Sequence, residues 1–139
     1  MFARVVLAYD GSDGAKVALA RVAEFAARCG SEVHVLAVGR LPEYAETRSE
    51  VEEAREQAEH FYKERVKEAA AMLAGKGIAV RMRVEMGKPG DVIIRVAKEV
   101  RADLIVLGAN PHSVLRRRVV GATADKVVDR AACTVMVVR

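Results

Sequence analysis

Five short apolar runs alternate along the chain with four longer segments whose apolar residues recur every three or four positions. The apolar runs lie at 3–9, 32–38, 78–85, 102–107 and 133–138, and the helical segments lie at 13–28, 49–74, 91–100 and about 121–132. Strands that alternate with helices predict a parallel sheet with helices on both faces. The chain has 139 residues, a length that suits one domain, so we expect a single α/β domain over residues 1–139.

The distribution of apolar residues along each run indicates where its strand lies in the sheet. Runs 3–9 and 102–107 are the most continuously apolar, as expected of central strands that are buried on both faces. Run 78–85 alternates apolar with charged residues, which is typical of a strand at an edge. With right-handed crossovers, these features predict a doubly wound five-stranded parallel sheet in the order 3-2-1-4-5. Such sheets bind ligands at the carboxyl ends of their strands, here where the order reverses between the first and fourth strands.

Two segments that are distant in the sequence follow those two strands and should meet at this crevice. Asp10, Gly11 and Ser12 come after the first strand, and the segment from Gly108 to Thr123 comes after the fourth. The second segment has a glycine near each end and precedes a helix, so backbone N–H groups and the helix dipole can face a phosphate. The sequence therefore predicts a phosphate site, to which the Thr123 hydroxyl can add a donor.

Several residues of the crevice could either bind a ligand or serve an ordinary structural or surface role. The Asp10 carboxylate can accept hydrogen bonds from ribose hydroxyls or an adenine edge, or it can form an Asx turn with the nearby backbone. Arg116, Arg117 and Arg118 can neutralise phosphate charge, or they can lie in a solvated surface loop. His112 is the histidine placed in this loop. The residues alone leave these alternatives open.

Other features narrow the classes of function. The chain contains neither GxGxxG nor GxxxxGK[ST], and its residues form no recognisable catalytic set or metal-ligand spacing. Aromatic residues make up 4% of the chain, and its net charge of +4 is spread among many acidic residues, which argues against a nucleic-acid partner. The apolar runs are too short to span a membrane, so we expect a cytoplasmic protein with no membrane partner.

Four stretches carry a resemblance to a known family. They are VVLAYDGS near the start, DLIVLGA before the loop, the spacing of Gly108 and Gly121, and GATADKVVDRAACTVMVV at the end. In this order and at these distances they resemble the universal stress protein family over essentially the whole chain. The resemblance implies an adenine nucleotide alpha hydrolase-like fold and a homodimer that pairs the last strands, 133–138 here. It also implies ATP or AMP, with Mg²⁺, as ligands of the nucleotide-binding members.

The same resemblance assigns candidate nucleotide-binding residues. Asp10 matches the aspartate that contacts the nucleoside, and Val38 matches a position whose backbone meets adenine. Gly108 and Gly121 match glycines of the phosphate loop. The full set of candidates is Tyr9, Asp10, Val38, Gly108, Asn110, Gly121, Ala122 and Thr123, with Arg117 and Arg118 for phosphate charge. No catalytic residue and no metal ligand is assigned.

Two positions depart from the pattern of the ATP-binding members. Pro111 stands where a glycine is expected and has no N–H to donate, and Ala122 stands where a hydroxyl is expected. Each lost hydrogen bond to a charged phosphate costs about 1.5–3 kcal/mol. Two such losses weaken affinity by roughly two to four powers of ten.

The sequence therefore leads to three hypotheses about function. The first is a dimeric, cytoplasmic regulatory module of the stress response that binds an adenine nucleotide in a partly degenerate crevice. The second is a slow ATPase. The third is a dimer that interacts with proteins and binds no nucleotide. Because the sequence offers no well-placed catalytic base, it favours the first hypothesis over the second.

Overall fold

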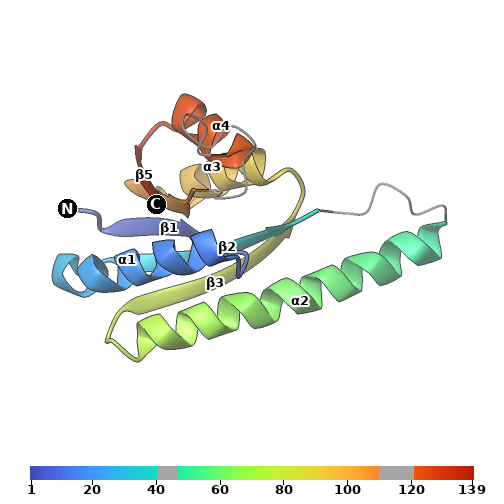
Figure 1. Ribbon diagram of the computed structural model, residues 1–139, viewed down its shortest axis with the longest axis horizontal. Helices are drawn as coiled ribbons and strands as arrows, with labels where there is room; N and C mark the ends of the chain where they lie inside the picture. Colours follow the sequence, from blue (N-terminus) through green and yellow to red (C-terminus); the bar gives the residue numbers. More distant parts are fainter. Residues whose placement is uncertain (41–46, 110–120) are drawn as a thin grey trace.

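Strands and helices alternate along the chain, as their sequence periods predicted (Figure 1). The computed structural model describes residues 1–40, 47–109 and 121–139. The strands are β1 (Arg4–Ala8), β2 (Glu32–Gly39), β3 (Ala79–Met86), β4 (Leu104–Gly108) and β5 (Thr134–Val138). The helices are α1 (Asp13–Cys29), α2 (Arg48–Ala74), α3 (Pro89–Glu99) and α4 (Ala122–Arg130).

The strands run parallel in one sheet, in the order β3-β2-β1-β4-β5, which confirms the predicted order. Val6 of the central strand β1 lies opposite His34 of β2 and Ile105 of β4. Val6 has no exposed surface, as the continuous apolar run indicated. Met82 of β3 is 55% exposed, which agrees with the expected edge position of this strand, since an edge strand has a neighbouring strand on one side only.

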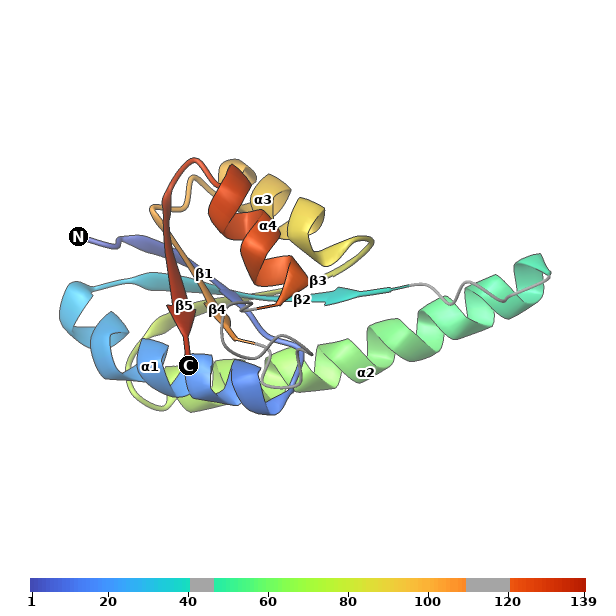
Figure 2. The same ribbon diagram turned by 45° about the horizontal axis from the view of Figure 1, so that its top comes forward.

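The helices cover both faces of the sheet (Figure 2). Successive residues of a strand point to opposite faces, so each strand contributes to two aliphatic cores. One core lies between the sheet and α1 and α2, and the other lies between the sheet and α3 and α4. Their buried members include Leu7, Val22, Leu73 and Val106 in the first core, and Val6, Val96, Ile105 and Val127 in the second. Packing on both faces holds the carboxyl ends of the strands in place.

The helices begin at capping signals, one of which differs from the sequence prediction. Ser12 caps α1 by accepting a hydrogen bond from the Ala15 N–H at 3.2 Å. The third helix was expected to begin near Asp91, but α3 begins at Pro89. Proline suits the first helical position because it has no N–H to satisfy there. Asp91 forms an ion pair of 2.7 Å with Lys126 instead, and this pair joins α3 to α4.

Four charged side chains join β3 to α3. Arg95 donates to Glu85 at 2.6 Å and to Glu99 at 2.8 Å, and Arg83 donates to both glutamates from the strand. The hydrogen bonds from Arg95 and Arg83 hold the pKa of the Glu85 carboxyl below its usual range. The network fixes α3 against the edge strand, and the first turns of α3 form one wall of the site described below.

None of the helices within the described ranges is long and apolar enough to cross a membrane. The longest, α2, extends well past the sheet (Figure 2). Charged pairs such as Arg55 with Glu59, at 3.0 Å, lie on its exposed surface. Oppositely charged residues three or four positions apart on a helix form such pairs on a solvated face.

Candidate functional site

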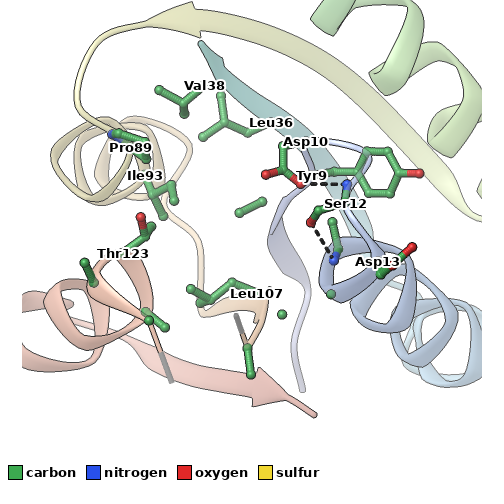
Figure 3. Close-up of a pocket in the computed structure, with 18 of the residues that line it drawn as sticks. Tyr9, Asp10, Ser12, Asp13, Leu36, Val38, Pro89, Ile93, Leu107 and Thr123 are labelled. Atoms are coloured by element: carbon green, nitrogen blue, oxygen red, sulfur yellow. Dashed lines mark hydrogen bonds between the residues drawn. The ribbon is translucent and has the colours of Figure 1, made fainter. Parts of the chain in front are cut away.

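A pocket of about 430 Å³ opens at the carboxyl ends of β1, β2 and β4, where the strand order reverses (Figure 3). The sequence predicted a crevice at this place. The volume lies within the roughly 300–1,000 Å³ that small-molecule sites occupy. Three helices, α1, α3 and α4, begin at its rim, because parallel strands followed by helices place helix N-termini at this edge.

Most of the predicted nucleotide-binding residues line this pocket together. They are Tyr9, Asp10, Val38, Gly108, Gly121, Ala122 and Thr123. Candidates Asn110, Arg117 and Arg118 lie outside the described residues, as do Pro111, His112 and Arg116. The described part of the site therefore combines the ends of β1, β2 and β4 with the start of α4, so that residues from the first and last thirds of the chain meet.

Asp10 forms the Asx turn that the sequence offered as one alternative, and its geometry stays compatible with the other. One carboxylate oxygen accepts a hydrogen bond from the Ser12 N–H at 2.9 Å, which forms an Asx turn at the start of α1. The other oxygen points into the pocket (Figure 3). The turn orients the carboxylate, so Asp10 can hold its second oxygen toward a ligand at little further cost in side-chain entropy.

Tyr9 lines the pocket with its backbone rather than with its phenol group. The ring points away from the cavity (Figure 3) and is only 4% exposed, in the core that contains residues of α1 and α2. Burial raises the pKa of the Tyr9 hydroxyl, and the nearby Glu68 charge raises it further. Tyr9 therefore lines the pocket, as a predicted binding residue should, but its phenol group does not face a ligand there. The residue before a turn is free to face either side, and packing decided the direction.

Gly108 is required for close packing between two backbone segments. A Cβ atom at Gly108 would overlap the Gly14 carbonyl group, and a Cβ at Gly14 would lie 2.5 Å from the Ala109 oxygen. The end of β4 and the first turn of α1 therefore touch backbone to backbone. Besides the phosphate approach predicted for Gly108, this packing is a separate reason for glycine at the position.

Among the described residues, no side chain caps the N-terminus of α4, which borders the pocket. Gly121 precedes the helix with φ 114° and ψ 151°, a conformation that favours glycine, and it has no side chain with which to cap the helix. Helix α1 is already capped by Ser12 and carries Asp13, and α3 has Pro89 in its first turn. The first-turn N–H groups of α4 and its dipole can therefore bind a negatively charged group.

The other wall of the pocket is apolar, and Val38 is its one residue that the sequence predicted. Leu36, Val38, Ile93 and Leu107 line it, and Ile93 lies beside Thr123 on the side opposite Asp10 (Figure 3). Ile93 belongs to the apolar stripe of α3, so nothing in its spacing separates it from core residues. Two other lining residues lie close to strand ends: Arg40 follows β2 directly, and Pro89 begins α3 three residues after β3 ends. This position at the strand ends was a usable signal.

Acidic residues at the pocket do not form a metal centre within the part of the chain that the structure describes. No group of three or more His, Cys, Asp or Glu side chains in these ranges is close enough to hold a metal ion. Asp10 and Asp13 both line the pocket, and Arg40 adds a positive charge. The described site thus suits a ligand with hydroxyl donors, an apolar body and one anionic group.

Comparison with known proteins gives a match along the entire chain. The sequence model of the universal stress protein family matches residues 1–139. A Staphylococcus aureus (strain USA300) protein named for this family is 28% identical over 140 residues, which cover 99% of this chain and 84% of the relative. These matches confirm the resemblance noted in the sequence.

Solved structures of related proteins share the fold. Universal stress protein UspA from Lactobacillus plantarum has a TM-score of 0.84 at 24% identity, covering 99% of this chain and 98% of that one. A universal stress protein from Archaeoglobus fulgidus, solved in complex with dAMP, has a TM-score of 0.68 at 27% identity, covering 100% and 98%. A family protein from Arabidopsis thaliana, solved with AMP bound, has a TM-score of 0.74 at 20% identity, covering 97% and 90%. The adenine nucleotide alpha hydrolase-like fold is thereby confirmed.

Proposed function

Because the chain belongs to the universal stress protein family, we propose that it binds an adenine nucleoside monophosphate and acts as a cytoplasmic regulatory module that responds to this ligand. One observation carries the proposal. The free oxygen of Asp10 and the open N-terminus of α4 lie on opposite sides of one pocket, with an apolar wall beside them (Figure 3). These features match the ribose, phosphate and base of a nucleotide.

Each part of the nucleotide has a suitable partner. The Asp10 carboxylate accepts hydrogen bonds from ribose hydroxyls, and charge-assisted bonds of this kind are stronger than neutral ones. The base packs against the apolar wall that includes Val38 and Ile93. The phosphate binds to the first-turn N–H groups of α4, with the Thr123 hydroxyl nearby. The AMP and dAMP complexes of related proteins support this class of ligand.

The described donors suit one phosphate group better than three. Ala122 begins α4 without a hydroxyl, and α3 begins with a proline that has no N–H. The helix dipole acts mainly within the first turn, so its effect decreases for phosphates farther along a triphosphate chain. We therefore propose AMP as the ligand to test first, with ATP and Mg²⁺ as the comparison.

Calorimetric titration of the nucleotide-free protein tests this proposal. Asp10→Asn keeps an oxygen that can accept from the Ser12 N–H but replaces the pocket-facing oxygen and removes the charge. We expect this variant to bind AMP about tenfold more weakly or worse, because a hydrogen bond to a charged group contributes about 1.5–3 kcal/mol. Asp129→Asn is the matched control, since Asp129 is exposed on α4 and does not line the pocket. It should leave the affinity unchanged.

Two outcomes would contradict the proposal. One is a native protein that binds neither AMP nor ATP with Mg²⁺ at millimolar ligand. The other is an Asp10→Asn variant whose AMP affinity equals that of the native protein. Tight ATP binding with weak AMP binding would instead assign the main recognition to the outer phosphates.

We also propose that two copies of the chain pair through β5. This strand bonds to β4 on one side, and Val135, Met136 and Val137 are only partly buried at the sheet edge. An apolar edge strand is a ready partner for another strand. Sedimentation equilibrium at micromolar concentration is expected to give twice the 15.1 kDa mass of one chain. A monomer mass at tens of micromolar protein would contradict this proposal.

A further inference from the structure

Arg65 of α2 lies directly against the turn that carries Asp10. A Cβ atom placed on Gly11 would lie 2.8 Å from Cδ of Arg65 and 3.3 Å from Cγ. Gly11 has φ +83°, in the left-handed region that glycine tolerates best. The stem of the arginine thus occupies the space that a side chain at position 11 would need, and it supports the turn from the side of α2.

The head of Arg65 is held by other residues of the same helix. Its guanidinium carbon lies 4.9 Å from the centre of the Phe61 ring, and Nη2 donates to Glu68 at 3.2 Å. Nε is buried and has no hydrogen-bond partner within the described residues. A stacked and paired guanidinium has few alternative rotamers, so the stem stays against the turn.

The charges of Arg65 and Glu68 also lie near Tyr9, the residue directly before Asp10. The charges of Glu68 and Arg65 act on the phenol group in opposite directions, Glu68 raising the pKa of Tyr9 and Arg65 lowering it. The Tyr9 ring packs in the core with Val66, the residue after Arg65. Asp10 therefore lies between Tyr9, which packs in the same core as Val66, and Gly11, which lies against Arg65.

We propose that Arg65 is a positioning residue for the nucleotide site, holding the β1–α1 turn so that the free oxygen of Asp10 faces the pocket. This inference rests on the proposed function only where AMP binding is measured; the role of Arg65 in holding the turn does not depend on any ligand. Arg65 does not line the pocket, so it acts through Asp10 and not by touching the nucleotide. Its loss releases the turn without removing any pocket side chain.

Amide hydrogen exchange of the ligand-free protein tests the inference without any nucleotide. The Ser12 N–H donates to Asp10, so its exchange rate reports how often the turn opens. We expect Arg65→Ala to speed this exchange about tenfold, which corresponds to about 1.4 kcal/mol. Arg65→Met keeps most of the stem and should stay within about threefold of the native rate, and it serves if Arg65→Ala fails to fold. Arg55→Ala, on an exposed part of the same helix, should change nothing.

A double-mutant cycle with AMP supplies the second readout. Arg65→Ala alone is expected to weaken AMP binding about fivefold to tenfold, and to have no further effect in the Asp10→Asn background. Unchanged Ser12 exchange in Arg65→Ala, or equal acceleration in Arg55→Ala, would overturn the inference. Additive effects of Arg65→Ala and Asp10→Asn would overturn it as well. If the native protein binds no nucleotide, the proposed function fails, while the exchange data still decide the role of Arg65.

Discussion

Replacing Gly108 by alanine is expected to lower the free energy of unfolding by about 3 kcal/mol or more, at or above the upper end of the range for overpacked sites. The added Cβ would overlap the carbonyl group of Gly14, which belongs to the first turn of α1. Neither partner is a flexible side chain, so relief requires moving a strand end or a helix. Urea unfolding, followed by circular dichroism, measures the change.

The structure supplies both a matched control and a second test of this contact. Gly75 has right-handed helical angles, so Gly75→Ala should change stability by less than about 1 kcal/mol. Gly14→Ala should destabilise in the same way as Gly108→Ala, because its Cβ would lie 2.5 Å from the Ala109 oxygen. A Gly108→Ala protein that unfolds at the native urea concentration would show that the two backbone segments are not in contact.

Replacing Ala122 by serine is expected to tighten AMP binding by about 10- to 100-fold. Ala122 is the first residue of α4 and lines the pocket, so a hydroxyl there can donate to a phosphate held at the helix N-terminus. A hydrogen bond to a charged group contributes about 1.5–3 kcal/mol, and each 1.4 kcal/mol is tenfold in affinity. Calorimetry with AMP and with adenosine measures the effect on the phosphate alone.

Adenosine is the informative control for this variant. Ala122→Ser should leave adenosine affinity unchanged, because the nucleoside has no phosphate to receive the new donor. Ala132→Ser, an exposed position outside the pocket, should affect neither ligand. Equal tightening for AMP and adenosine would place the hydroxyl beside the sugar or base. No change for AMP would mean that the phosphate does not bind at the start of α4.

The sequence was sufficient to predict the sheet and the place of the site. Continuous apolar runs put β1 and β4 in the centre, and the alternation of 78–85 put β3 at an edge. These patterns work because burial on one or two faces directly selects residue types along a strand. Parallel topology then brings Asp10 and Gly121 to one crevice, although they are far apart in the chain.

The direction of individual side chains was not predictable in the same way. Nothing local distinguishes a Tyr9 ring that faces the pocket from one that faces α2, and the choice depends on the core that forms there. The start of α3 at Pro89 and the ion pair of Asp91 with Lys126 likewise depend on a neighbouring helix. Such features come from packing between segments, and periodicity within a segment carries no information about them.

By itself, the sequence determined the α/β class, the strand order, the crevice at the reversal of that order and the family to which the chain belongs. Only the tertiary structure decided that Gly108 packs against Gly14, that Ile93 forms a wall of the pocket and that Arg65 supports the turn of Asp10. The physical reason is the range of the interactions. Strand and helix patterns record burial along one segment, whereas close contacts between segments depend on the positions of atoms that only the complete fold defines.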